Sequence, residues 1–350
     1  MKDLYFERVC ELADYIVKST DPKMKWMWGE ALLGYALDEL DKFNNENKYT
    51  EFLLKYCDYW AAHDPAVDQS DTLAPGLITY AMQKRTGNTG YVRLTEKVLN
   101  YIQTGPRIYG DCLNHLGNSG KAKLYPKSVW VDSVMMFSVF TSLYGKENNN
   151  QELIDFAARQ PKQYKDMLQD KNGLWYHAYW SKRGKPYPGK GIYWGRGNGW
   201  VIAGFPMILD NIGDHTEKEE IVNILKETSE ALLPCMREDN TFSTLLTEPK
   251  TYRELSATAL IAAGWMHGVR MGYLPDKFLE PAKKAFIACV EAIKNEDGGI
   301  YFNEISGPTI PLQVFPKLGY KLVPLGKNWS YGVAAIIFAA IEYAKVNSWF

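Results

Sequence analysis

The stretch "VAAIIFAAI", Val333–Ile341, places no polar side chain on any side of the helix that it is expected to form. A helix that is apolar all round is stable only where other elements bury each of its faces. Much of five further segments has the same character: Trp26–Leu40, Asp71–Met82, Val131–Leu143, Trp200–Leu209 and Leu260–Met266. The sequence therefore predicts six helices that lie inside the molecule.

Helices of a second kind alternate with the buried ones along the chain. Their apolar residues recur at helical spacing on one face only, as in Phe278, Ala282 and Ala285. The pattern covers roughly residues 5–19, 48–62, 91–104, 153–168, 221–232 and 278–293. Such a helix covers a neighbouring surface and does not fill the centre.

This alternation indicates a repeated helical hairpin of about 45 to 75 residues. It predicts an all-α fold, an (α/α)6 barrel with six parallel inner helices and six outer helices around them. An open α-solenoid is the alternative, although it would not bury its inner helices on all sides. No linker or charge block divides residues 1–350, so we expect a single domain. Short alternating pieces at Thr241–Leu246 and Gly299–Asn303 predict small hairpins within loops.

The composition argues against several classes of function. The formal net charge is -1, and the Lys and Arg residues are spread along the chain, which argues against binding to nucleic acid or to an anionic membrane surface. No run approaches the ~18 apolar residues of a membrane span, and the first residues lack the features of a signal peptide. Five scattered cysteines fit a reduced chain better than a disulfide framework, so we expect a cytoplasmic location.

Aromatic and charged residues gather in the loops that lead into the predicted inner helices. These loops are Lys25–Gly29, Asp68–Thr72, Ser128–Ser133, Trp194–Trp200, Thr251–Ser256 and Lys327–Gly332. Loops at the opposite end, such as Asn44–Lys48, are polar turns. Because sugar rings present apolar C–H faces, this asymmetry favours a carbohydrate site at one end of the barrel. Ordinary core and rim aromatics are the alternative.

Two aspartates, Asp71 and Asp132, occupy matching positions where inner helices are predicted to begin. The structural interpretation is helix capping, since Asp suits that position. The catalytic interpretation is a carboxyl pair, in which burial and a like-charged neighbour raise one pKa so that one acid stays protonated near neutral pH. We take both residues as catalytic candidates.

The segment Trp194-Gly-Arg-Gly-Asn-Gly-Trp200 is rich in glycine, but its spacing is not that of a dinucleotide-binding loop and no βαβ unit surrounds it. It lies at the start of a predicted buried helix, where anions are attracted. Arg196 can grip a carboxylate, and Trp194 and Trp200 can pack a flat ring. The segment therefore predicts a site for an acidic sugar, and a structural turn with a buried Arg is the alternative.

Two histidines lie in aromatic or polar loops, His177 in Leu174–Trp180 and His115 in Cys112–His115. A lone histidine is commonly a structural residue. The Cys112 and His115 spacing occurs in zinc sites, but no second pair accompanies it, so we expect no metal.

Taken together, these motifs resemble the unsaturated rhamnogalacturonyl hydrolases of glycoside hydrolase family 105 and the related unsaturated glucuronyl hydrolases of family 88. The resemblance extends along essentially the whole chain. It rests on Asp71–Gly76, Trp130–Phe137, Trp194–Trp200, Glu254–Ala259 and Trp329–Gly332.

The resemblance implies an (α/α)6 barrel without a cofactor, acting on small oligosaccharides that end in a Δ4,5-unsaturated uronic acid. It implies hydration of the double bond, with Asp132 as general acid/base and Asp71 as the second carboxylate. Trp194, Arg196, Trp200 and His177 then line the uronate subsite, and Trp28 and His115 lie at its mouth. Residues 117–127 form a longer tract between His115 and Trp130 than this family pattern leads us to expect.

Other functions remain open on the sequence alone. An inverting glycosidase on the same barrel would need two carboxyl groups ~6.5–9.5 Å apart. A non-catalytic sugar-binding toroid would need no acid at all. The leaving sugar is open between rhamnose, a glycosaminoglycan hexosamine and an algal sugar, and we expect a monomer or a simple homo-oligomer.

Overall fold

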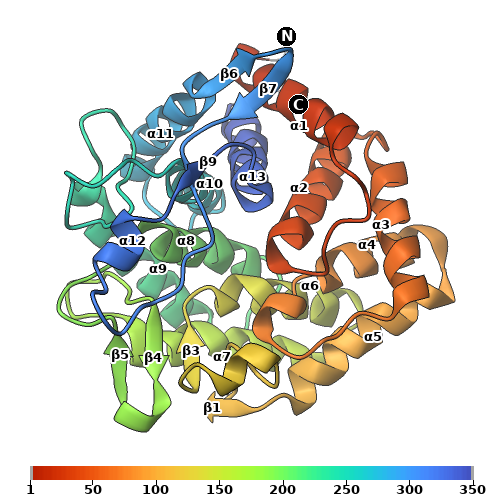
Figure 1. Ribbon diagram of the computed structural model, residues 1–350, viewed down its shortest axis with the longest axis horizontal. Helices are drawn as coiled ribbons and strands as arrows, with labels where there is room; N and C mark the ends of the chain where they lie inside the picture. The colour runs from red at the N-terminus through yellow and green to blue at the C-terminus, as the bar shows by residue number, and fades with distance from the viewer. Residues whose placement is uncertain (1–2, 348–350) are drawn as a thin grey trace.

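The structure is a computed structural model that describes residues 3–347, and within them twelve helices of nine or more residues form two concentric sets (Figure 1). The inner set is α2 (Trp28–Asn44), α4 (Gly76–Thr86), α6 (Val139–Glu147), α8 (Gly195–Leu209), α10 (Leu255–Arg270) and α13 (Ser330–Val346). The outer set is α1 (Leu4–Ser19), α3 (Thr50–His63), α5 (Thr89–Thr104), α7 (Gln151–Leu168), α9 (Lys218–Leu232) and α11 (Leu279–Glu291). The predicted alternation of six inner and six outer helices is confirmed.

The inner helices close into a ring. Along the chain, α2 packs on α4, α4 on α6, α6 on α8, α8 on α10 and α10 on α13, and α13 returns to pack on α2. Every residue of α13 from Tyr331 to Ala344 is buried, as the apolar sequence of that helix requires. By contrast, α5 buries one face only, through residues such as Leu94, Val98 and Ile102. A closed ring satisfies both kinds of helix, and the fold is the (α/α)6 barrel, not an open solenoid.

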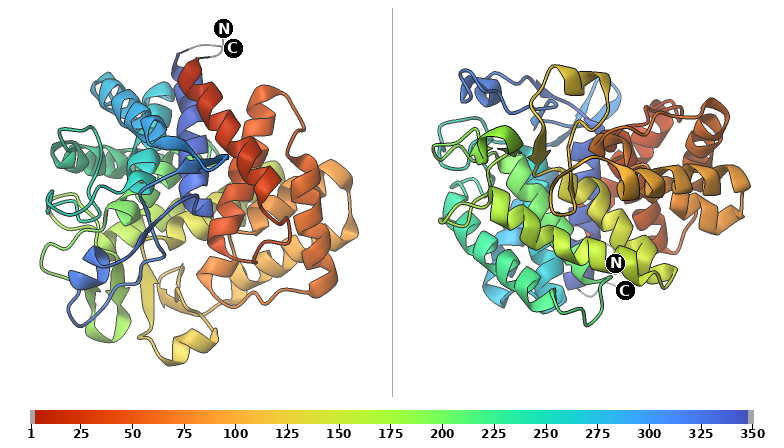
Figure 2. Two further views of the ribbon diagram at one scale, coloured as in Figure 1. Left: turned by 45° about the horizontal axis from the view of Figure 1, so that its top comes forward. Right: turned by 90° about the horizontal axis from the view of Figure 1, so that it is seen from below.

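The strands and irregular connections complete the loops of the barrel. Antiparallel pairs are β1 (Arg107–Tyr109) with β2 (Cys112–Leu113), β6 (Ile293–Glu296) with β7 (Gly299–Phe302), and β8 (Ile305–Ser306) with β9 (Leu325–Gly326). A three-stranded sheet has the order β3 (Ser128–Trp130), β4 (Ala178–Trp180), β5 (Lys185–Tyr187). The side view in Figure 2 places the segment of the short helix α12 (Leu318–Lys321) and the segment of β1 to β3 at the same end of the barrel.

Three local expectations need correction. Residues 71–75 do not belong to α4, because Ser70–Thr72 forms a 3-10 turn and Pro75 stands at the N-cap of the helix. Residues 131–138 do not belong to α6 either, because a π-helical turn, Val134–Ser138, precedes it. The predicted hairpin at residues 241–246 is absent from the described chain, where Ser243 and Leu245 make only isolated bridges.

None of the helices within residues 3–347 is both long enough and apolar enough to span a membrane.

The tightest approach between inner helices predicts a sensitive position. A Cβ added to Gly264 of α10 would lie 2.1 Å from the backbone oxygen of Ile202 in α8. We expect Gly264→Ala to lower the free energy of unfolding by about 1–3 kcal/mol or more, because two inner helices must move apart. Urea unfolding measures this. Gly120→Ala is the control, since a Cβ there meets no atom within 4 Å, and equal stability of the two variants would contradict the prediction.

Candidate active site

A cavity of about 340 Å³ opens at the end of the barrel where the inner helices begin. It brings together residues from the starts of α2, α8 and α13 and from the loops before α4 and α6. Six of the eight predicted site residues line it: Trp28, Asp71, His115, Asp132, Trp194 and Arg196. The other two, His177 and Trp200, lie behind its wall.

Neither aspartate caps a helix. Asp71 lies inside the 3-10 turn, whose N-cap is Gln69, and the hydroxyl of Thr72 accepts from the backbone N–H of Gln69. Asp132 precedes the π-helical turn, whose N-cap is Ser133, without a side-chain cap bond. The structural interpretation of the two carboxylates therefore fails, and both are free to act in the cavity.

Asp71 has the environment of a carboxyl group that keeps its proton. Its side chain is only 17% exposed, and the Nε2 atom of His115 lies 3.5 Å from Oδ1. Burial, and to a lesser degree the negative charge of Asp132, raises the pKa of Asp71 to about 7. Of the two carboxyl groups, Asp71 is thus the one that is protonated near neutral pH.

Asp132 is also buried, but His177 holds it in the ionised form. The Nδ1 atom of His177 lies 2.9 Å from the hydroxyl of Tyr320, and Nε2 faces Oδ2 of Asp132 at 3.4 Å. Burial opposes ionisation of Asp132, yet His177, together with His115 and a backbone hydrogen bond, outweighs it, and the pKa of Asp132 falls below its usual value. His177 thus acts through Asp132 and does not line the cavity.

Trp130 fixes both histidines. Its ring stacks on His115 at 4.0 Å between centroids, and the ring of His177 meets it edge-on at 5.4 Å. Burial lowers the pKa of His115 to about 3, so that this imidazole is neutral, with Nδ1 2.9 Å from the hydroxyl of Ser133. Cys112 instead donates to Gln163, which separates it from His115 as a ligand pair. Among residues 3–347, no group of three or more His, Cys, Asp and Glu side chains could hold a metal ion.

Arg196 is fully buried, and its terminal nitrogens are already used. Nη1 donates to the backbone oxygen and hydroxyl of Ser306, and Nη2 donates to the backbone oxygen of Gly307 and to Thr309. Glu254, also fully buried, lies 3.7 Å from Nη1. The bidentate grip on a carboxylate that the sequence suggested is therefore not available in this arrangement. Arg196 instead anchors the segment that forms one wall of the cavity.

Two of the three predicted site tryptophans line the cavity, and the third is buried behind them. Trp28 lines the cavity and stacks on Tyr331 with centroids 4.5 Å apart. Trp194 lines it too, backed by the stacked ring of His177 at 4.2 Å. Trp200 is fully buried and meets Trp28 edge-on from behind. The predicted contact between Trp200 and a sugar ring is thus not available, because Trp28 stands between them.

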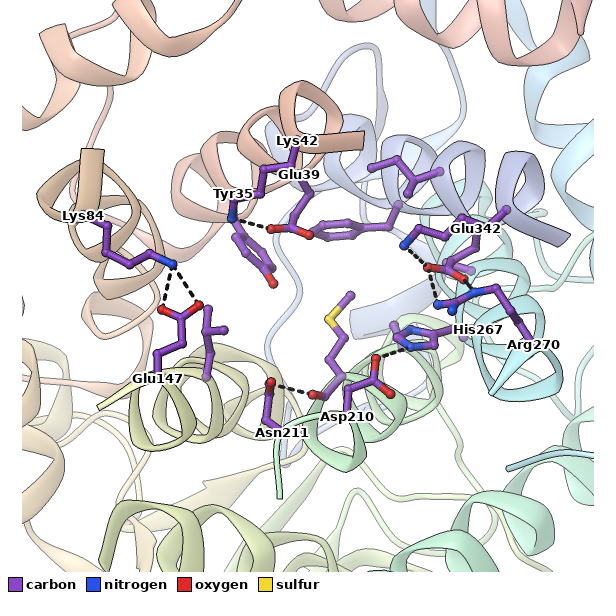
Figure 3. A pocket seen from close by; sticks show the side chains of 18 residues that line it. Tyr35, Glu39, Lys42, Lys84, Glu147, Asp210, Asn211, His267, Arg270 and Glu342 are labelled. Carbon is purple, nitrogen blue, oxygen red and sulfur yellow. Dashed lines mark hydrogen bonds and ion pairs between the residues drawn. The ribbon is translucent and has the colours of Figure 1, made fainter. Parts of the chain in front are cut away.

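A second cavity of about 340 Å³ lies at the opposite end, where the inner helices finish (Figure 3). The charged side chains labelled there are paired, among them Lys84 with Glu147, Asp210 with His267, and Arg270 with Glu342, each at 2.7 Å. The first cavity differs, because Nε1 of Trp194 and Nε of Arg196 are buried without a partner in the described chain. With its carboxyl pair, the first cavity is therefore our candidate active site.

Comparison with known proteins agrees with this geometry. Residues 5–347 match the family described as Glycosyl Hydrolase Family 88. The chain belongs to this family. It is therefore a glycoside hydrolase, and the suspected relationship to families 88 and 105 is confirmed.

Individual relatives point the same way. The enzyme is 27% identical to unsaturated rhamnogalacturonyl hydrolase YesR of Bacillus subtilis (strain 168), over 97% of this chain and 96% of that protein. It is 29% identical to an unsaturated 3S-rhamnoglycuronyl hydrolase of Formosa agariphila, over 65% of this chain and 60% of that protein. A family 105 glycoside hydrolase of C. acetobutylicum has the same fold, with a TM-score of 0.87, 24% identity and coverage of 98% and 100% of the two chains.

Sequence reasoning missed several residues of the site. Tyr320 orients His177 from 143 positions away, and no local pattern marks it. Lys121 reaches the cavity from the tract 117–127, whose length was the one available signal. Glu30 lines the cavity within a helix whose apolar character hid it.

The raised pKa of Asp71 predicts a cost in stability at high pH. Below about pH 4 the group is protonated in both folded and unfolded chains, whereas between about pH 4 and 7 only the unfolded chain ionises readily, so the folded state loses stability as the pH rises. We expect Asp71→Asn to gain about 2–3 kcal/mol over the wild type at pH 8 relative to pH 4.5. Urea unfolding at both pH values measures this. Exposed Glu46→Gln is the control, and an equal pH dependence of Asp71→Asn and wild type would refute the environment assigned to Asp71.

Proposed function

We propose that the enzyme removes a terminal Δ4,5-unsaturated uronic acid from short oligosaccharides produced by polysaccharide lyases, with an unsaturated rhamnogalacturonan disaccharide as its substrate. The near full-length similarity to an unsaturated rhamnogalacturonyl hydrolase supports this substrate. None of the five cysteines forms a disulfide bond, which favours a cytoplasmic location. No metal or organic cofactor takes part in the proposed reaction.

The observation that carries the proposal is the carboxyl pair, which holds one proton near neutral pH. Protonation of carbon requires an acid that is still protonated at the working pH, and Asp71 meets this condition. Activation of water requires a carboxylate, and Asp132 meets that one. The cavity thus contains one protonated and one ionised carboxyl group.

In the proposed reaction, Asp132 gives a proton to C4 of the enol ether, and water adds at C5 while the same carboxylate accepts its proton. The hemiketal at C5 then opens and releases the neighbouring sugar. Before the first of these steps, the proton held by Asp71 passes to Asp132 as the substrate binds.

The remaining residues hold the ring. Trp28 offers an aromatic face to the planar, unsaturated sugar, whereas Trp194, 1% exposed and packed against His177 and Arg196, shapes the wall of the cavity. Arg196 attracts the substrate carboxylate by its charge, but its terminal donors are engaged, so we assign the direct contact to Lys121 at the cavity. His177 is a positioning residue that acts through Asp132.

A second candidate substrate carries a sulfated or algal leaving sugar. Similarity to two unsaturated 3S-rhamnoglycuronyl hydrolases favours it, although each covers only part of the chain. Loss of ultraviolet absorbance measured side by side on unsaturated disaccharides with each leaving sugar decides between the two substrates.

Hydration predicts that the conjugated chromophore is lost as the sugar is released. We expect the wild type to lose ultraviolet absorbance with the unsaturated disaccharide, and Asp132→Asn to lower kcat by about 10²–10⁴-fold, because the proton donor is gone. The saturated disaccharide is the matched control. Equal cleavage of the saturated sugar would exclude hydration and favour direct displacement at the anomeric carbon.

The pH profile tests where the proton lies. We expect kcat/KM to fall as the pH rises through about 7, since the free enzyme then loses the proton held by Asp71. The residual activity of Asp71→Asn should lack this descending limb. A wild-type profile that is flat from pH 6 to 9 would show that the pair does not supply the proton.

A further inference from the structure

A shallow groove of about 430 Å³ lies directly beside the catalytic cavity. The aromatic side chains of Tyr59 and Trp60, from the last turns of α3, form one side of it. Lys25 and Met27 line both the groove and the cavity. These side chains, from the loop between α1 and α2, therefore lie between the two spaces.

The groove also abuts the cavity along a second segment. In the 3-10 turn Ser70–Thr72, Asp71 faces the catalytic cavity, whereas Thr72 and the preceding Asp68 and Gln69 line the groove. Two neighbouring stretches of chain, 23–27 and 68–72, thus present some residues to the reacting end and others to the groove. The groove and the cavity therefore adjoin along both stretches.

The groove is held rigidly. The indole of Trp26 donates to the backbone oxygen of Thr72 at 2.9 Å and stacks on Tyr56 of α3. The indole of Trp60 donates to the backbone oxygen of Met24 at 2.9 Å. The backbone oxygen of Asp68 accepts from the hydroxyl of Tyr101 at 2.6 Å. A preformed surface of this kind binds a ligand without first ordering its own loops.

The chemistry of the groove suits an acidic carbohydrate. Partly exposed aromatic rings take the C–H faces of sugars, and Asp68 and Gln69 take hydroxyl groups. Two exposed lysines, Lys23 and Lys25, line the groove beside the single carboxylate of Asp68. The net charge of these side chains is therefore positive, which favours an acidic sugar.

We propose that this groove is a subsite for the leaving side of the substrate, and that it binds an oligosaccharide of at least four sugars through a second uronate. This inference rests on the proposed function, since it extends the same substrate beyond the cavity. The enzyme then prefers longer lyase products to the disaccharide.

Chain length tests the inference. Steady-state kinetics compare the unsaturated disaccharide with the unsaturated tetrasaccharide of alternating uronate and rhamnose. We expect kcat/KM of the wild type to be about five-fold higher or more for the tetrasaccharide, through KM. Tyr59→Ala and Lys23→Ala should remove this preference and leave the disaccharide rate unchanged. When the distal uronate of the tetrasaccharide is methyl-esterified, the part of the kcat/KM preference that depends on Lys23 should disappear.

Matched controls are Tyr109→Ala and Lys18→Ala, exposed residues away from the groove that should keep the preference. Equal kcat/KM for both lengths in the wild type would overturn the subsite while leaving the proposed function intact. If neither oligosaccharide is turned over, the proposed function fails, and calorimetry with the saturated tetrasaccharide decides on the groove. Binding that weakens in Tyr59→Ala supports the groove, and absence of binding overturns it.

Discussion

The burial of six apolar helices is the constraint on which the rest of the structure depends. A helix such as α13, buried from Tyr331 to Ala344, needs neighbours on every side. The inner helices supply these neighbours to one another by closing a ring, and the one-sided outer helices seal it. Since each outer helix carries the chain back to the same end, all inner helices run parallel. Their first residues, and the loops that lead into them, therefore meet at a single place, and the candidate active-site cavity lies there.

Much of this could be predicted from the sequence because it follows from hydrophobic periodicity, which is a local property. The number and order of the helices, and the end at which the site lies, need no knowledge of contacts. The starts of α4 and α6 were predicted wrongly for a related reason. The residues at 71–75 and 131–138 are as buried as the helices that follow, so periodicity cannot distinguish a 3-10 or π-helical turn from the helix itself.

The chemistry of single side chains was less predictable, because it depends on partners that are distant in sequence. Arg196 looked like a carboxylate ligand from its neighbours in the chain, yet residues 110 to 113 positions away occupy its terminal nitrogens. His177 depends in the same way on Tyr320. The pair of aspartates could be predicted, but which of them keeps the proton could not. That assignment follows from the burial that raises the pKa of Asp71 and from the contact with His177 that lowers the pKa of Asp132, and local sequence encodes neither.

Because the inner helices run parallel, the negative ends of their dipoles lie at one end of the barrel and the positive ends at the other. The final turns of the inner helices carry basic residues, including Lys42, Lys84 and Arg270, where the helix dipole is negative. These and other charged side chains form ion pairs with one another, so the cavity where the inner helices end contains little unpaired charge. The opposite end collects the positive ends of the same dipoles, and an anionic sugar is favoured there. The positive helix ends alone would promote ionisation of both aspartates. Burial of Asp71 opposes this effect strongly enough to retain one proton, and so the cavity can bind an anion and still act as an acid.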